Sequence, residues 1–100
     1  MATTLKALAR GSFATSSATL YTVPAGTTTV LSNITICNTT SAYVNFFILL
    51  DGVELFSTTP IAAYTTTVID IKQAMAATKI ISGYADAAGV KYHFSGAEIS

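Results

Sequence analysis

The sequence predicts an all-β protein, folded as a single antiparallel β-sandwich of about seven to eight strands. Segments rich in Thr, Val, Ile and aromatic residues recur along the 100-residue chain, with turn signals between them. The densest apolar run, residues 42–50, has apolar side chains on both faces of a predicted strand. Such a strand lies inside a two-sheet core or is covered by another chain. The alternating pattern leaves jelly-roll and immunoglobulin-like strand orders both open.

The first elements are predicted from short local patterns. Residues 1–12 form an N-terminal arm or edge strand, and the sandwich domain spans residues 13–100. Leu5 and Leu8 make this arm a candidate for contact with a neighbouring subunit. A strand over residues 13–23 ends at a turn that contains Pro24 and Gly26. The strand over residues 27–37 is predicted to direct one face to the core, with Thr28, Val30, Ile34 and Ile36.

The central strand ends at the strongest local signal in the chain, Asp51-Gly52. This pair predicts a two-residue type I′ hairpin, because both central positions of that turn need positive φ. The expected register pairs Leu50 with Val53, Ile48 with Leu55, and Phe47 with Phe56.

The C-terminal half is predicted to hold three more strands and one helical element. Residues 64–71 are rich in β-branched side chains and predict a strand. Residues 71–77, IKQAMAA, are the only run of good helix formers and predict a short helix or helical turn. Residues 79–85 and 90–96 are predicted to form a hairpin around the turn that ends at Gly89. The predicted structural turn residues are Pro24, Gly26, Asp51, Gly52 and Gly89.

Charge is scarce in this chain and indicates what the surface contacts. Charged residues make up 10% of the sequence, against about 25% in ordinary soluble domains. None occurs between Arg10 and Asp51. Because charges are depleted at the centres of interfaces, this predicts a surface in permanent contact with other subunits. The candidate interface residues are Tyr43, Phe47, Leu49, Leu5 and Leu8.

Other partners are not favoured by the composition. Five basic and five acidic residues are dispersed, without the basic patch that nucleic-acid binding needs. The longest unbroken apolar run, residues 46–50, is far shorter than the roughly 20 residues of a membrane-spanning helix. Neither nucleic acid nor a membrane is therefore predicted as a partner.

No catalytic, cofactor or metal site is predicted. His93 is the only residue that titrates near neutral pH unaided, and alone it favours a packing or interface role. Cys37 has no partner and is interpreted as a small buried thiol. The carboxylates are dispersed, and no Cys or His pair stands at metal-ligand spacing. Sugar binding by Tyr21, Tyr43 and Tyr64 is an alternative to their packing in a core or interface.

Three segments carry a resemblance to known proteins: LYTVPAGTTTVLSNITICNTT at residues 20–40, TTPIAAYTTTVI at residues 58–69, and AAGVKYHFSGAEI at residues 87–99. Together they resemble the small β-sandwich virion proteins of tailed bacteriophages. The resemblance implies a non-enzymatic structural protein, either a head decoration (cement) protein or a module of the tail, baseplate or fibre. For the second of these, binding of host-surface glycans is the alternative function. The resemblance also implies a location in the virion after synthesis in the host cytoplasm. Its expected partners are copies of itself, with a trimer as one arrangement, and other virion proteins such as the major capsid protein.

Overall fold

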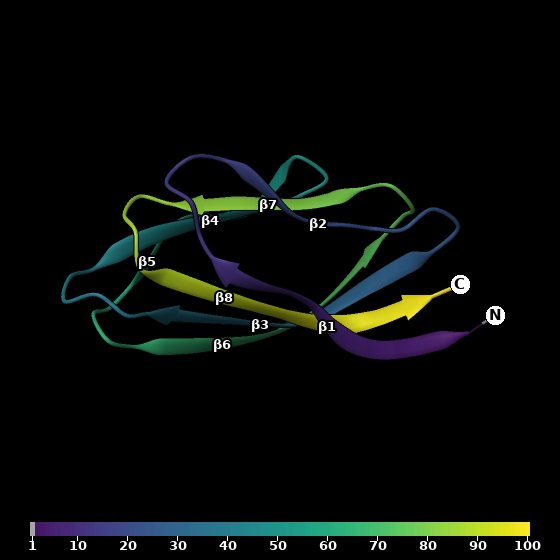
Figure 1. Cartoon of the computed structure of the whole chain (residues 1–100), viewed down its shortest axis with the longest axis horizontal. Helices are drawn as coiled ribbons and strands as arrows, with labels where there is room; N and C mark the ends of the chain where they lie inside the picture. The colour runs from purple at the N-terminus through teal and green to yellow at the C-terminus, as the bar shows by residue number, and fades with distance from the viewer. Residues whose placement is uncertain (1) are drawn as a thin grey trace.

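The computed structural model describes residues 2–100, which form two four-stranded antiparallel sheets packed face to face (Figure 1). Sheet A has the strand order β1-β8-β3-β6, and sheet B has the order β2-β7-β4-β5. The strands are β1 (Thr3–Ser12), β2 (Ala18–Thr22), β3 (Thr28–Asn38), β4 (Val44–Leu50), β5 (Val53–Ile61), β6 (Thr66–Met75), β7 (Ile80–Ala85) and β8 (Val90–Ile99). The fold is the antiparallel β-sandwich that the sequence predicts.

The strand pairing is that of a jelly roll. Each strand in the first half of the chain pairs with its counterpart counted from the other end: β1 with β8, β2 with β7, β3 with β6, and β4 with β5. The chain is therefore one long antiparallel ribbon that rolls up. Rolling brings β8 beside β3 and β7 beside β4, which completes the two sheets. This order distinguishes the fold from the immunoglobulin-like alternative.

The hydrophobic core lies between the sheets and is filled from alternate positions of the central strands. Its fully buried large side chains are Leu31, Ile34, Ile36, Phe46, Ile48, Ile81, Val90 and Phe94. Burying each of these side chains contributes roughly 1.5–3 kcal/mol before the entropy cost of ordering the chain. Because side chains alternate between the two faces of a strand, the residues between these buried positions face outward and can contact other molecules.

The predicted helix or helical turn at residues 71–77 is wrong. β6 continues through Met75 and pairs with β3 from Thr66, opposite Cys37, to Met75, opposite Thr29. The chain turns only after Met75, and Thr78 has a φ of 71° in that turn. Helix propensity is a weak preference, and here the ladder to β3 and the burial of Met75 override it.

The predicted hairpin between residues 79–85 and 90–96 is also wrong. β7 belongs to sheet B and β8 to sheet A, so residues 86–89 cross from one sheet to the other. The turn residue Gly89 has a φ of 104°, and its carbonyl accepts hydrogen bonds from the Thr39 backbone N at 3.0 Å and the Thr39 hydroxyl at 2.6 Å. A turn signal shows where the chain reverses, but not which sheet the next strand joins.

The Asp51-Gly52 hairpin forms as predicted, although its register does not continue. Asp51 and Gly52 have φ angles of 54° and 75°, and Leu50 lies opposite Val53. Ile48 lies opposite Phe56, so the predicted pairs of Ile48 with Leu55 and of Phe47 with Phe56 do not form. A β-bulge in β5 accounts for the shift, because Leu55 is an extra residue on that strand.

The core face of β3 changes sides at Ser32. Thr29 and Leu31 are buried before this point, and Ile34 and Ile36 after it. Ser32 is an extra residue relative to β8, and such a bulge reverses which side chains face the core. Two of the predicted core residues, Thr28 and Val30, therefore lie on the outer face instead.

Candidate interaction surfaces

The outer face of sheet B is free of charge over three of its four strands. β2, β7 and β4 contain no Asp, Glu, Lys or Arg. Phe46 and Ile48 are buried in the core, whereas Phe47 and Leu49 alternate with them and are partly exposed. Phe47 and Leu49 therefore face outward. Two carboxylates border this face. Glu54, on the edge strand β5, lies opposite Leu49, and Asp86, after β7, accepts hydrogen bonds from the backbone N and side-chain amide of Asn45 at 3.0 Å.

Phe47 forms a stacked aromatic pair with Tyr84 of the neighbouring strand. The ring centroids are 4.4 Å apart and the ring planes differ by 10°. The two residues lie directly opposite each other in the β4–β7 ladder, and Leu49 follows two residues along β4. We call Phe47, Leu49 and Tyr84 the aromatic platform. Aromatic and aliphatic side chains that are themselves uncharged are enriched at interface centres, with charged residues at the rim.

The five predicted interface residues are not brought together on one surface. Phe47 and Leu49 share the aromatic platform. Tyr43 is 75% exposed in the loop before β4, and Leu5 is 82% exposed on β1. Leu8 lies at the β1 bulge, partly buried against the core. Their roles in contacts remain predictions.

Sequence reasoning missed Tyr84 as a platform residue. Its alternation with the buried Ala85 signals an outward position in β7. Its neighbour Phe47 follows only from the pairing of β7 with β4, which no local pattern encodes.

The outer face of sheet A carries a second apolar surface near the chain ends. Leu5 lies opposite Ala97, Ala97 opposite Val30, and Val30 opposite Ala74, so one row crosses all four strands. We call Leu5, Ala97, Val30 and Ala74 the apolar row. Next to this row, Thr3 of β1 and Thr28 of β3 both lie opposite Ile99 of β8.

Farther along sheet A, the outer face becomes polar and charged. Arg10 lies opposite His93, which in turn lies opposite Thr35. Lys91 is exposed two residues from His93 on the same strand. The carboxylate of this face is Asp70 on β6, which accepts a hydrogen bond from the Asn33 amide at 3.2 Å. The face is thus basic toward β1 and β8, whereas β6 carries Asp70 together with the exposed Lys72.

A polar network joins the two sheets near the chain ends. The Tyr21 hydroxyl of β2 contacts the Glu98 Oε2 of β8 at 2.5 Å and the Thr29 hydroxyl of β3 at 2.8 Å. Lys6 Nζ of β1 lies 3.3 Å from Glu98 Oε1. Burial, followed by the neighbouring Glu98, raises the pKa of Tyr21. The hydrogen bond from Tyr21, aided by Lys6, lowers the pKa of Glu98.

The opposite end of the molecule is organised by Asn38, which is fully buried. Its side-chain amide donates to the carbonyls of Ala42, Ile61 and Ala62 at 2.8–3.2 Å. Its side-chain oxygen accepts from the Thr40 backbone N at 2.9 Å and from the Thr40 hydroxyl at 2.7 Å. This one side chain therefore ties the β3–β4 loop to the β5–β6 loop.

The three tyrosines considered for sugar binding are divided between the two ends. Tyr43 follows the loop that Asn38 holds, and the Tyr64 backbone N donates to the Thr40 carbonyl at 3.1 Å. Both rings are 75% exposed. Tyr21, by contrast, is engaged with Glu98 near the chain ends.

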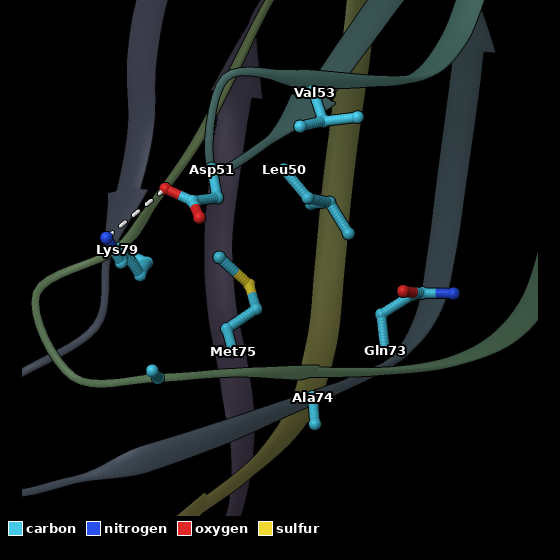
Figure 2. Close-up of a pocket in the computed structure, with 8 residues that line it drawn as sticks. Leu50, Asp51, Val53, Gln73, Ala74, Met75 and Lys79 are labelled. Carbon is cyan, nitrogen blue, oxygen red and sulfur yellow. Dashed lines mark ion pairs between the residues drawn. The ribbon is translucent and has the colours of Figure 1, made fainter.

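A groove of about 380 Å³ lies between the hairpin tip of sheet B and the end of β6 (Figure 2). In Figure 2, Met75 points from β6 toward the hairpin, between Leu50 and Asp51. The Asp51 Oδ1 and Lys79 Nζ atoms are 3.7 Å apart at the rim, with both side chains about half exposed. Because Asp51 and Lys79 pair with each other, the groove has few polar groups free to orient a small molecule.

His93 and Cys37 both lie on the outer face of sheet A, where Cys37 is opposite Lys91 and His93 is opposite Thr35. His93 is exposed on sheet A, and Cys37 is partly rather than fully buried on the same face. Among residues 2–100, no three His, Cys, Asp or Glu side chains gather where they could hold a metal ion. The same part of the chain has no helix long and apolar enough to cross a membrane.

Comparison with known proteins adds no assignment. No protein-family model matches the chain, and a search of curated protein sequences finds no significant match.

Proposed function

We propose that this chain is a non-enzymatic structural protein of a bacteriophage particle, a decoration or cement protein that stabilises the head shell through subunit contacts. The observation that carries the proposal is the aromatic platform on the outer face of sheet B, where β2, β7 and β4 have no charged residue. A stacked Phe47–Tyr84 pair beside Leu49 is suited to burial against another protein. Jelly rolls recur in viral capsid proteins, which supports the proposal by fold analogy alone.

The size of the face agrees with a docking role. The Cα atoms span 45 × 21 × 18 Å, so a sheet face offers an area of the order of the roughly 800 Å² that each partner buries in a standard interface. A partner that binds the folded domain also stabilises it by mass action, and repetition over many copies stabilises the assembly. The partners proposed are the major capsid protein and further copies of the chain.

The test is binding of the purified chain to phage particles that lack it. We expect wild-type protein to bind these particles, and Phe47→Lys to bind them at least about tenfold more weakly, because it places a charge at the interface centre. Val53→Lys, on the exposed hairpin away from the platform, is the matched control and should bind normally. Thermal melts of the three proteins check folding. Failure of the wild type to bind, or equal binding by Phe47→Lys, would refute the proposal.

A second candidate is a tail, baseplate or fibre module that binds host-surface glycans. Tyr43 and Tyr64 favour it, because both rings are exposed at the same end on loops that Asn38 ties together. Aromatic rings held in fixed loops can stack on sugar rings. A glycan array probed with wild type, Tyr43→Ala and Tyr64→Ala is the test. Binding that either substitution removes would favour this candidate, and a blank array would exclude it.

A further inference from the structure

We propose that the outer face of sheet A binds a second copy of this chain, face to face, about a two-fold axis parallel to the strands. The axis runs between β8 and β3, the two central strands of sheet A. It places β1 of one copy over β6 of the second copy, and β8 over β3. This surface lies on the opposite side of the sandwich from the aromatic platform, so the inference does not rest on the proposed function.

The apolar row is complementary to itself in size under this symmetry. Leu5 is 82% exposed at one end of the row, and the small, exposed Ala74 stands at the other end. The two-fold axis sets Leu5 over Ala74 of the second copy, and Val30 over Ala97 of the second copy. Each larger side chain therefore meets a small one, and each such contact occurs twice.

The charges on the same face are complementary under the same symmetry. Arg10 is set over Val68 of the second copy, which is 62% exposed and two residues from Asp70 on β6. Two residues of a strand span about 6.8 Å, a distance that an arginine side chain can cover. The described ion pairs involve neither Arg10 nor Asp70, so both charges are available.

The remaining basic groups meet no like charge in this arrangement. Lys91 and His93 of β8 are set over β3, whose outward residues at those positions are Cys37 and Thr35. Lys72, exposed on β6 between Asp70 and Ala74, is set over β1 between Ala7 and Leu5, where the intervening Lys6 alternates to the other face of the strand and pairs with Glu98. A two-fold axis perpendicular to the strands would instead place β1 over β1, with Arg10 three strands away from Asp70. Charge therefore favours the parallel axis.

The edges of sheet A are poorer docking surfaces than its face. β1 has a bulge at Leu8, and β6 has an extra residue in the segment of Ile71 and Lys72 opposite Ser32. Bulges and edge charges are common devices that prevent strands of different molecules from pairing. The face, at about 45 × 18 Å between Cα extremes, is large enough for a standard interface.

The experiment is a charge-exchange cycle read by sedimentation equilibrium of the full chain over a range of concentrations. We expect wild-type protein to reach the mass of a dimer. Arg10→Asp and Asp70→Arg, each alone, should raise the dimer dissociation constant on the order of a hundredfold, because each creates two like-charge contacts. The double variant carries both exchanges and should restore dimerisation to within about tenfold of wild type. That rescue separates a specific contact from general damage.

Further variants locate the contact and control for folding. Leu5→Lys should abolish the dimer, whereas Val53→Lys, on the exposed β4–β5 hairpin outside both the apolar row and the aromatic platform, should leave its mass unchanged. Circular dichroism and thermal melts of every variant establish that it is folded. A monomeric or trimeric wild type, a dimer that Leu5→Lys does not weaken, or a double variant no better than the single ones would each overturn the inference. Particle binding by a monomeric wild type would overturn the dimer and leave the proposed function standing.

Discussion

The Tyr21 hydroxyl is the contact through which β2 of sheet B reaches Glu98 and Thr29 of sheet A. We expect Tyr21→Phe to lower the free energy of unfolding by about 1 kcal/mol at pH 7, because it removes a hydrogen bond to a carboxylate. Urea unfolding of both proteins measures this difference. Thr19→Val, a change on the outer side of the same strand, is the control and should have little effect.

The same network predicts a pH dependence. The folded pKa of Glu98 lies below its ordinary value of 4.5. The contribution of Glu98 to the free energy of unfolding is therefore present above pH 4.5 and is lost as pH falls through the folded pKa. The pKa of Tyr21 is raised above 10.0, so that contribution is present below pH 10 and is lost as pH rises through the folded pKa. The stability difference between wild type and Tyr21→Phe should therefore shrink toward pH 3. A difference that stays constant from pH 7 to pH 3 would contradict this.

Asn38 is the residue on which the loop end of the molecule depends most. Asn38→Ala would leave the carbonyls of Ala42, Ile61 and Ala62 without their shared donor in a buried place. We expect a loss of about 2–4 kcal/mol in the free energy of unfolding, measured by chemical denaturation. Ser32→Ala, at an exposed bulge position, should cost far less, and equal costs would show that the Asn38 network is unimportant.

At the scale of elements, the β4–β5 hairpin turn depends on backbone conformation more than on contacts. Gly52 has a φ of 75°, and a Cβ atom built on it meets no atom within 4 Å. Gly52→Ala should therefore cost about 1–2 kcal/mol through the left-handed backbone alone. Asp51→Asn is the control, because Asn also favours this conformation and the exposed Asp51–Lys79 pair contributes little. Thermal denaturation of both variants tests whether Gly52→Ala lowers the melting temperature more than Asp51→Asn does.

The same elements show how far the sequence predicts this fold. Local chemistry is sufficient to predict the fold class and the Asp51-Gly52 turn. It also predicts that Ile34 and Ile36, after the bulge at Ser32, face the core. It is insufficient at Val30, because a one-residue bulge reverses the faces of a strand without a clear signal. It is also insufficient for IKQAMAA, where pairing with β3 outweighs helix propensity.

The candidate surfaces were predictable only in part, for a related reason. Alternation along β4 predicts that either Phe47 or Phe46 faces outward, and the structure selects Phe47. Tyr84 and the apolar row depend on which strands lie side by side. That arrangement is set by the rolling of the whole ribbon, so it is not encoded in any short segment.

At the scale of the whole molecule, the rolled ribbon makes most strand pairs distant in sequence. Within residues 2–100, β4 and β5 are the only consecutive strands that pair with each other. The outermost pair, β1 and β8, joins residues from opposite ends of the chain, and Ala2 and Ser100 exchange backbone hydrogen bonds of 2.7 and 2.9 Å. Because long loops must close before such pairs form, we expect the domain to fold in milliseconds to seconds rather than microseconds.

This topology makes a prediction about a rearranged chain. A short Gly-Ser linker from Ser100 to Ala2, with new ends between the exposed Ala87 and Ala88, would turn β8 and β1 into a hairpin. The entropy cost of bringing β1 and β8 together is smaller when the loop between them is shorter. The permuted chain should therefore fold on the order of tenfold faster, as measured by stopped-flow fluorescence of its tyrosines. Its unfolding rate should change less, because the permuted chain retains all native contacts except those at residues 86–89. Equal folding rates would mean that β1–β8 pairing follows the rate-limiting step, so that the folding nucleus forms without the outermost strand pair.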